Sequence, residues 1–265
     1  MTDLVRIETE PRGVARLVLA RGDKHNALSP EMLTELEAAA RDLAKDEAAR
    51  VVVLQAEGAS FCAGGDLAWM RAQFGMDPAA RHRESRRIAT ALGALAALPQ
   101  PLVGRVQGNA FGGGLGLISV CDVAVGVAGA RFGFTETRLG LLPANIGPYV
   151  LARMGAARAR EVFMNARLFD AEEAVRLGLL ARAVPPERLD AAVEAEITPY
   201  LACAPGAVRA AKALLADLTG RVTEAQVDLA VEALADRWET EEAQQGVAAF
   251  FDRRPPPWQE GGEPG

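Results

Sequence analysis

Two glycine-rich loops carry the groups in this sequence that are best suited to chemistry. The triplet Gly112–Gly114 follows a short apolar run, and Gly64 and Gly65 close a second loop that begins at Ala59. Glycine adopts backbone angles closed to other residues and lets a bound molecule approach the main chain. If the triplet begins a helix, its first N–H groups are unpaired donors at the positive end of the helix dipole. The alternative is that the triplet has only a packing role, in which it lets a helix cross close to a strand.

The two loops are more informative together than apart. Each follows an apolar run typical of a strand, at 51–54 and 101–106. If these strands are parallel neighbours, their carboxyl ends bring the loops to one edge of the sheet. An N–H group from each loop could then point at one oxygen and form an oxyanion hole, which stabilises negative charge on a carbonyl oxygen. A phosphate-binding loop is disfavoured, because no Gly-Lys-Ser/Thr follows and the glycine spacing is not G-x-G-x-x-G.

Glu136 is the candidate acid–base group. It lies between apolar neighbours in the segment 132–138. A carboxyl group near apolar walls has a raised pKa and can exchange protons near neutral pH. The alternative is a solvated loop glutamate with Arg138 as its surface partner.

Other chemistries have less support. His25 and His82 are far apart and no Cys/His cluster occurs, so no metal site is expected. No Gly-x-Ser-x-Gly motif is present, and Cys62 is interpreted as a small core residue rather than a nucleophile. Five arginines form a basic cluster after the Gly64 loop, which indicates either a solvated helix face or a site for anionic substrate groups. They are Arg71, Arg81, Arg83, Arg86 and Arg87.

The elements around these groups alternate between strands and helices, which predicts an α/β fold with parallel strands and crossover connections. Ser29 and Pro30 are typical of a helix start before 31–46. The segment 70–78 is expected to be irregular. The predicted strands are 13–19, 51–54, 101–106 and 122–126, and the later predicted helices are 79–98, 149–154, 157–165, 170–177 with Asp170 as cap, 186–201, 206–218 and 223–252.

Composition limits the class of protein. The net charge of −6 argues against general nucleic-acid binding, and three scattered cysteines among 265 residues suggest no disulfide framework. The N-terminus lacks the pattern of a signal peptide, and no apolar run reaches the length of a membrane span. A cytoplasmic protein without membrane or nucleic-acid partners is expected.

Several ordered motifs resemble the crotonase superfamily, also called the enoyl-CoA hydratase/isomerase family. They are the segments 23–28, 61–67, 107–114, 132–143 and 242–254. The resemblance implies a spiral of ββα units in residues 1–200. It also implies a helical region in 201–265 that closes the active site and forms a homotrimer or a homohexamer.

The resemblance also implies site residues. Gly65 and Gly113 would supply the oxyanion-hole N–H groups, and Glu136 would be the catalytic acid–base. An acyl-CoA thioester would be the substrate, with coenzyme A as part of it and no further cofactor. The implied substrate-binding residues are Lys24, Ala63, Gly65, Asp66, Leu67, Ala68, Gly113 and Gly116, and the expected walls of the acyl pocket are Trp69, Met70, Phe74, Asn145 and Ile146.

One departure from the family pattern bears on the reaction. Typical hydratases of this family hold water between two glutamates, and the second of these aligns with Gly116. The favoured reaction is the reversible hydration of a 2-enoyl-CoA through Glu136 alone. The chain resembles the bacterial methylglutaconyl-CoA hydratase-type members of the family, which implies a branched or carboxylated substrate such as 3-methylglutaconyl-CoA. The distal carboxylate of such a substrate would meet the arginine cluster or Arg138. The alternatives are an enoyl-CoA double-bond isomerase and a non-catalytic acyl-CoA-binding protein.

Overall fold

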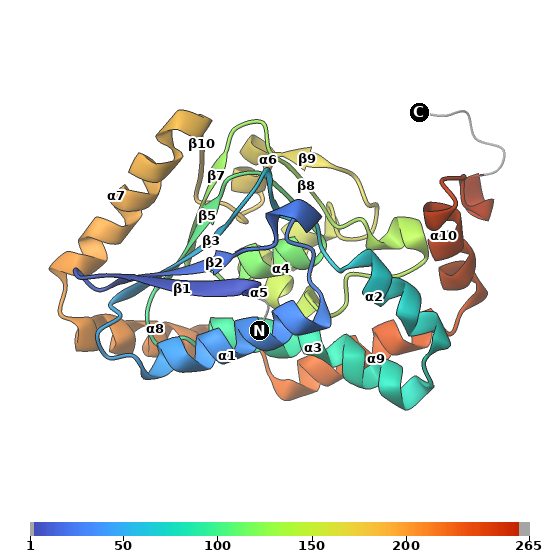
Figure 1. Cartoon of the computed structure of the whole chain (residues 1–265), viewed down its shortest axis with the longest axis horizontal. Helices are drawn as coiled ribbons and strands as arrows, with labels where there is room; N and C mark the ends of the chain where they lie inside the picture. Colours follow the sequence, from blue (N-terminus) through green and yellow to red (C-terminus); the bar gives the residue numbers. More distant parts are fainter. Residues whose placement is uncertain (1–2, 260–265) are drawn as a thin grey trace.

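The computed structural model describes residues 3–259, which form two β-sheets surrounded by helices (Figure 1). The larger sheet has the strand order β1-β2-β3-β5-β7-β10, and the smaller has the order β4-β6-β8-β9. The strands of the larger sheet are β1 (Val5–Glu10), β2 (Val14–Leu19), β3 (Val51–Ala56), β5 (Leu102–Val106), β7 (Val123–Val127) and β10 (Arg182–Val184). The strands of the smaller sheet are β4 (Ser60–Cys62), β6 (Asn109–Phe111), β8 (Arg131–Gly133) and β9 (Phe169–Asp170).

The chain repeats a unit of two strands and a helical segment, as the resemblance implied. In the second, third and fourth units the first strand joins the larger sheet and the second strand joins the smaller one. Consecutive units therefore stack side by side, with β3, β5 and β7 parallel and β4, β6 and β8 parallel. The helices of the four units are α1 (Pro30–Lys45), α2 (Leu67–Ala72) with α3 (Pro78–Ala96), α4 (Gly113–Ser119) and α5 (Gly147–Arg160).

Helices cover both faces of the larger sheet, which explains why its central strands are mostly apolar. In Figure 1, α1, α3 and α9 lie along one side of the molecule, and α7 packs on β3, β5 and β7. The remaining helices are α6 (Ala171–Arg176), α7 (Leu189–Ala202), α8 (Pro205–Thr219), α9 (Glu224–Trp238) and α10 (Glu241–Phe251). Within residues 3–259, no helix is both long and apolar enough to cross a bilayer.

The sequence-based elements need three corrections. The segment 70–78 is largely helical rather than irregular, because Asp66 caps α2 and Asp77 caps α3 with their side chains. The predicted helix 223–252 is two helices, since Thr240 caps a new start at α10. The predicted helix 157–165 is wrong. Its first turn belongs to α5, which continues through a kink at Gly155, and turns follow.

Candidate active site

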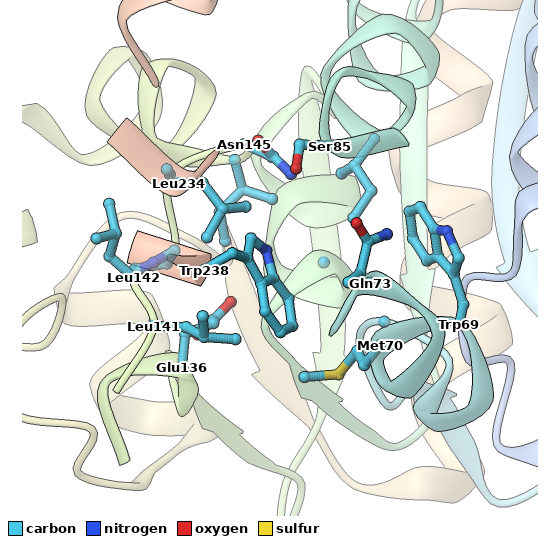
Figure 2. A pocket seen from close by; sticks show the side chains of 16 residues that line it. Trp69, Met70, Gln73, Ser85, Glu136, Leu141, Leu142, Asn145, Leu234 and Trp238 are labelled. Atoms are coloured by element: carbon cyan, nitrogen blue, oxygen red, sulfur yellow. The ribbon is translucent and has the colours of Figure 1, made fainter. Parts of the chain in front are cut away.

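A cavity of about 100 Å³ contains the three groups that the sequence singled out. Gly65, Gly113 and Glu136 all line it, although they come from three different units of the fold. Figure 2 shows Glu136 entering the cavity opposite a wall formed by Trp69 and Met70 of α2, with Trp238 of α9 between them in this view.

The two glycine loops meet because their strands are neighbours. Strand β4 pairs in parallel with β6, and Ser60 lies opposite Asn109. A Cβ atom built on Gly64 would lie 3.1 Å from the carbonyl oxygen of Phe111 and 3.7 Å from the nitrogen of Gly113. Within residues 3–259, neither the Gly65 N–H nor the Gly113 N–H donates a hydrogen bond. Two N–H groups without a partner in the described chain therefore lie on adjacent loops.

The first loop is fixed by the segment before α1. Leu28 N donates to Gly64 O at 2.7 Å, and Asp66 N donates to Leu28 O at 3.0 Å. The Asp66 carboxylate pairs with Arg21 at 2.8 Å and accepts from the N–H groups of Ala68 and Trp69. Although burial opposes it, the Arg21 guanidinium helps to hold the pKa of Asp66 below its usual value. The Asp66 side chain therefore holds the loop in place.

The second loop requires glycine for packing as well as for chemistry. Gly112 precedes α4 with φ +47°, and a Cβ atom there would lie 2.7 Å from Oε1 of Glu136. A Cβ atom on Gly113 would lie 2.7 Å from Cδ1 of Leu28, and one on Gly114 would lie 2.5 Å from Cys62 O. The two interpretations of the triplet are therefore compatible. The triplet begins a helix, and it also lets the main chain pack against its neighbours.

Glu136 begins the short 3-10 helix η3 (Glu136–Leu139), and its carboxyl group is held in an apolar environment. Its Oε2 atom is buried and has no hydrogen-bond partner among the described residues. Burial raises the pKa of Glu136 to about 7, which is suited to proton exchange near neutral pH. Arg138 is exposed and pairs with no carboxylate of the described chain. The interpretation of Glu136 as a solvated glutamate is therefore wrong.

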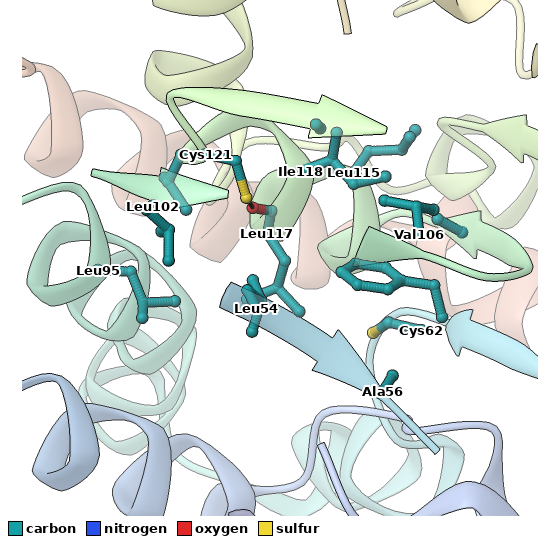
Figure 3. Close-up of a cluster of buried hydrophobic side chains, with 14 of the residues drawn as sticks. Leu54, Ala56, Cys62, Leu95, Leu102, Val106, Leu115, Leu117, Ile118 and Cys121 are labelled. Atoms are coloured by element: carbon teal, nitrogen blue, oxygen red, sulfur yellow. Dashed lines mark hydrogen bonds between the residues drawn. The ribbon is translucent and has the colours of Figure 1, made fainter. Parts of the chain in front are cut away.

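Cys62 lies behind the first loop rather than in the cavity. Figure 3 shows it among buried side chains of the core that include Ala56 and Val106. Burial raises the pKa of its thiol to about 12, so the thiol is neutral at physiological pH. This confirms the interpretation as a core residue. Among residues 3–259, no group of three or more His, Cys, Asp or Glu side chains could hold a metal ion.

The other implied substrate-binding residues lie outside the cavity or beneath it. Lys24, Ala63, Leu67 and Ala68 are exposed beside the first loop, which leaves them accessible to a long substrate. Gly116 is buried in α4 and does not line the cavity. A Cβ atom there would lie 2.6 Å from Cγ2 of Ile146 and 2.8 Å from Cδ1 of Leu92. A side chain at the position aligned with the second glutamate would therefore require Ile146 and Leu92 to shift.

The arginine cluster does not reach the cavity. Arg81 is buried, pairs with Glu239 and donates to the carbonyl oxygens of Gln73 and Met76 at 3.0 and 2.9 Å. Arg86 pairs with Glu224 and Asp228 of α9. The Cζ atom of Arg71 lies 4.1 Å from the centroid of the Phe251 ring. Arg83 is exposed, and Arg87 pairs with Glu84. Neither these arginines nor Arg138 line the cavity, and several of them join helices instead.

The expected pocket walls are correct for Trp69, Met70, Asn145 and Ile146, while Phe74 packs behind the wall against Trp238 at 5.1 Å between ring centroids. Sequence reasoning missed the contributions of α3 and α9. The missed lining residues include Gln73, Ser85, Ile88, Leu141, Leu142, Leu234 and Trp238. The period of apolar residues in α9 was a usable signal for a buried face, but it did not indicate what that face contacts.

Comparisons with known proteins agree with this arrangement. A family model described as enoyl-CoA hydratase/isomerase matches residues 9–261. The mitochondrial methylglutaconyl-CoA hydratase of Mus musculus is 31% identical over 263 residues, which cover 94% of this chain and 81% of that protein. A solved enoyl-CoA hydratase from Mycobacterium avium is 30% identical with a TM-score of 0.86, covering 97% of this chain and 100% of the other. One from Shewanella pealeana ATCC 700345 is 36% identical with a TM-score of 0.78, covering 96% of each chain.

Proposed function

Because this chain belongs to the enoyl-CoA hydratase/isomerase family, we propose that its cavity catalyses the reversible addition of water to a 2-enoyl-CoA thioester. The observation that carries the proposal is the meeting of two free N–H groups and one buried carboxyl group in a single cavity. These are the N–H groups of Gly65 and Gly113 and the side chain of Glu136. The coenzyme A is part of the substrate, and the reaction requires no further cofactor.

The oxyanion hole would act on the thioester carbonyl. Attack of water at the β-carbon moves electrons onto the thioester oxygen and gives an enolate. The N–H groups of Gly65 and Gly113 would donate to this oxygen, where negative charge develops. Removal of one such donor typically costs about 3 kcal/mol of transition-state stabilisation.

Glu136 would handle both protons of the reaction. As a carboxylate it takes a proton from the attacking water, whose oxygen bonds to the β-carbon. As a carboxylic acid it returns a proton to the α-carbon and regenerates the carboxylate. A pKa of about 7 suits both halves of this cycle, because both protonation states are accessible near neutral pH.

The acyl group is the finer part of the proposal. We propose 3-methylglutaconyl-CoA as a candidate substrate because the mouse relative is named methylglutaconyl-CoA hydratase. The described lining of the cavity contains no lysine or arginine to pair with the distal carboxylate of this substrate. Crotonyl-CoA is therefore tested beside it.

Double-bond isomerisation is the second candidate, and Gly116 favours it. An isomerase moves one proton between carbons and needs no water, so one carboxylate is sufficient. Position 116 is a glycine, so the second glutamate that would help to hold water is absent there. The product distinguishes the two reactions, since a hydratase gives a 3-hydroxyacyl-CoA and an isomerase gives a shifted double bond.

The test is an assay with crotonyl-CoA and 3-methylglutaconyl-CoA in parallel, with products identified by mass. We expect water addition by the wild type and a loss of about 10²- to 10⁴-fold in Glu136→Gln. A shifted double bond on a longer enoyl-CoA, without water addition, would assign the isomerase instead. Binding of the thioesters without any turnover would favour an acyl-CoA-binding protein.

We further propose that the helices of 201–265 mediate self-association, as the family resemblance implied. Helix α8 exposes three leucines on one face, namely Leu214, Leu215 and Leu218, with exposed fractions of 58, 62 and 74%. Contiguous apolar surface of this kind marks an interaction site. Sedimentation analysis should give a trimer or a hexamer, and a monomer at micromolar concentration would contradict the proposal.

A further inference from the structure

Three uncharged polar side chains gather in the cavity away from Glu136. They are Gln73 of the 3-10 helix η2 (Gln73–Gly75), Ser85 of α3 and Asn145 of the loop before α5. Figure 2 places Ser85 and Asn145 at the end of the cavity remote from Glu136, and the Gln73 amide also projects into it. The three residues are buried, with exposed fractions of 4, 3 and 6%. We call them the polar trio.

The polar trio is unpaired within the described chain. The Oε1 atom of Gln73 and the Oδ1 atom of Asn145 are buried without a hydrogen-bond partner in residues 3–259. The Ser85 hydroxyl also forms no hydrogen bond with the described residues. A buried polar group without a partner costs about 1–3 kcal/mol. Two such oxygens, together with the hydroxyl of Ser85, line one cavity, which indicates that a polar ligand group satisfies them.

The backbone that carries Gln73 is held firmly. Buried Arg81 donates to Gln73 O at 3.0 Å and to Met76 O at 2.9 Å, and it pairs with Glu239 after α9. The Gln73 side chain therefore extends from a fixed backbone into the cavity. A fixed polar group discriminates between ligands better than one that can move into solvent.

The charge of the cavity limits what the trio can bind. Among the described lining residues, Glu136 is the single group that titrates near neutral pH, and none carries a positive charge. A ligand carboxylate would be buried without a cation, which is costly. An alkyl chain would leave the trio unpaired.

A hydroxyl group fits these constraints. It both donates and accepts hydrogen bonds, so it can pair with an amide in either orientation, whereas a carboxylate can only accept. We propose that Gln73, Ser85 and Asn145 form a subsite that recognises an uncharged hydroxyl group on the acyl chain of the CoA thioester. This proposal rests on the proposed function, because it takes an acyl-CoA as the occupant of the cavity.

The test measures binding separately from turnover. Calorimetry compares saturated thioesters of equal chain length, namely hexanoyl-CoA, its 4-, 5- and 6-hydroxy derivatives and adipoyl-CoA, which ends in a carboxylate. We expect at least one hydroxy derivative to bind about tenfold or more tightly than hexanoyl-CoA, because one relieved polar group is worth about 1–3 kcal/mol. Adipoyl-CoA is expected to bind most weakly.

Two variants locate the preference. Asn145→Leu and Ser85→Ala should each raise the ratio of the hydroxy to the alkyl dissociation constants toward one, while hexanoyl-CoA binds as well as before or better. Ser119→Ala is the matched control. Its hydroxyl is also in a buried residue but donates to Leu115 O at 2.7 Å, and it does not line the cavity. The control should retain the wild-type preference.

The proposal is overturned if all hydroxy derivatives bind no better than hexanoyl-CoA, or if adipoyl-CoA binds most tightly. It is also overturned if both variants weaken the binding of every thioester equally, since the trio would then only support the cavity wall. The same holds if both variants reduce hydration equally on every enoyl-CoA, since the trio would then position the reacting water. A hydroxyl preference in a protein that hydrates no enoyl-CoA would support the subsite and overturn the proposed reaction alone. A lack of binding by any thioester would overturn both.

Discussion

Gly112 lies directly against the carboxyl group of Glu136, so that a Cβ atom at position 112 would be 2.7 Å from Oε1. The backbone there has φ +47° and ψ −115°, a conformation that side chains disfavour. The second glycine loop therefore contains the unpaired N–H group of Gly113 and, one residue earlier, the space that the Glu136 carboxyl group occupies. The two parts of the site depend on each other.

Gly112→Ala is expected to reduce turnover strongly, by about tenfold or more, because the methyl group displaces Glu136 from its position. Gly129→Ala is the matched control, since Gly129 also has a positive φ, +90°, but nothing lies within 4 Å of its added Cβ. Steady-state kinetics and urea unfolding of both variants separate the effect on the site from backbone strain. Equal losses of activity in the two variants would contradict the prediction.

The pH dependence of hydration should report Glu136. Because water attack requires the carboxylate, kcat/KM for hydration is expected to rise with pH and to level off above a midpoint near 7. The measurement is the initial rate on crotonyl-CoA between about pH 5 and pH 9, with protein stability checked at each pH. A flat profile across this range would show that Glu136 is not the base.

Glu136 should also lower stability at neutral and higher pH. Its folded pKa of about 7 lies above the ordinary value of 4.5, so the folded state binds more protons between these values. Stability therefore falls as pH rises from about 4.5 to 7, and the loss is complete above that range. The shift corresponds to about 3 kcal/mol.

Glu136→Gln lacks this ionisation and should be more stable than the wild type at pH about 8, by up to about 3 kcal/mol. The difference should shrink as pH approaches 4.5. Urea unfolding at the two pH values checks it, and a variant that is less stable than the wild type at the higher pH would contradict the assigned burial of this carboxyl group.

Gly116→Ala should destabilise the protein by about 1–3 kcal/mol, because its methyl group would overlap Ile146 and Leu92. The matched control is Gly206→Ala in α8, where nothing lies within 4 Å of the added Cβ. The control should be neutral or slightly stabilising. Thermal unfolding of the two variants measures the difference, and a stable Gly116→Ala protein would mean that the aligned position can accept a side chain after all.

The local features of this chain were determined by the sequence alone. Ser29 caps α1 with Pro30 at its first position, and Asp170 caps α6, as their residue types predicted. The apolar runs at 51–54 and 101–106 form adjacent parallel strands, so the two glycine loops meet at one edge. Caps, turns and buried strands could be predicted because each depends on residues that are close in sequence.

The tertiary structure decided the environment of each candidate residue. The sequence places Glu136 among apolar neighbours. That its Oε2 atom is buried without a hydrogen-bond partner in the described chain depends on how the units stack. The arginines of α3 form a basic cluster in the sequence, yet Arg81 is buried and pairs with Glu239, more than 150 residues later. The polar trio is assembled from three separate elements, one of them held in place by Arg81. Such features could not be predicted because burial and partner choice depend on residues that are distant in sequence and show no local pattern.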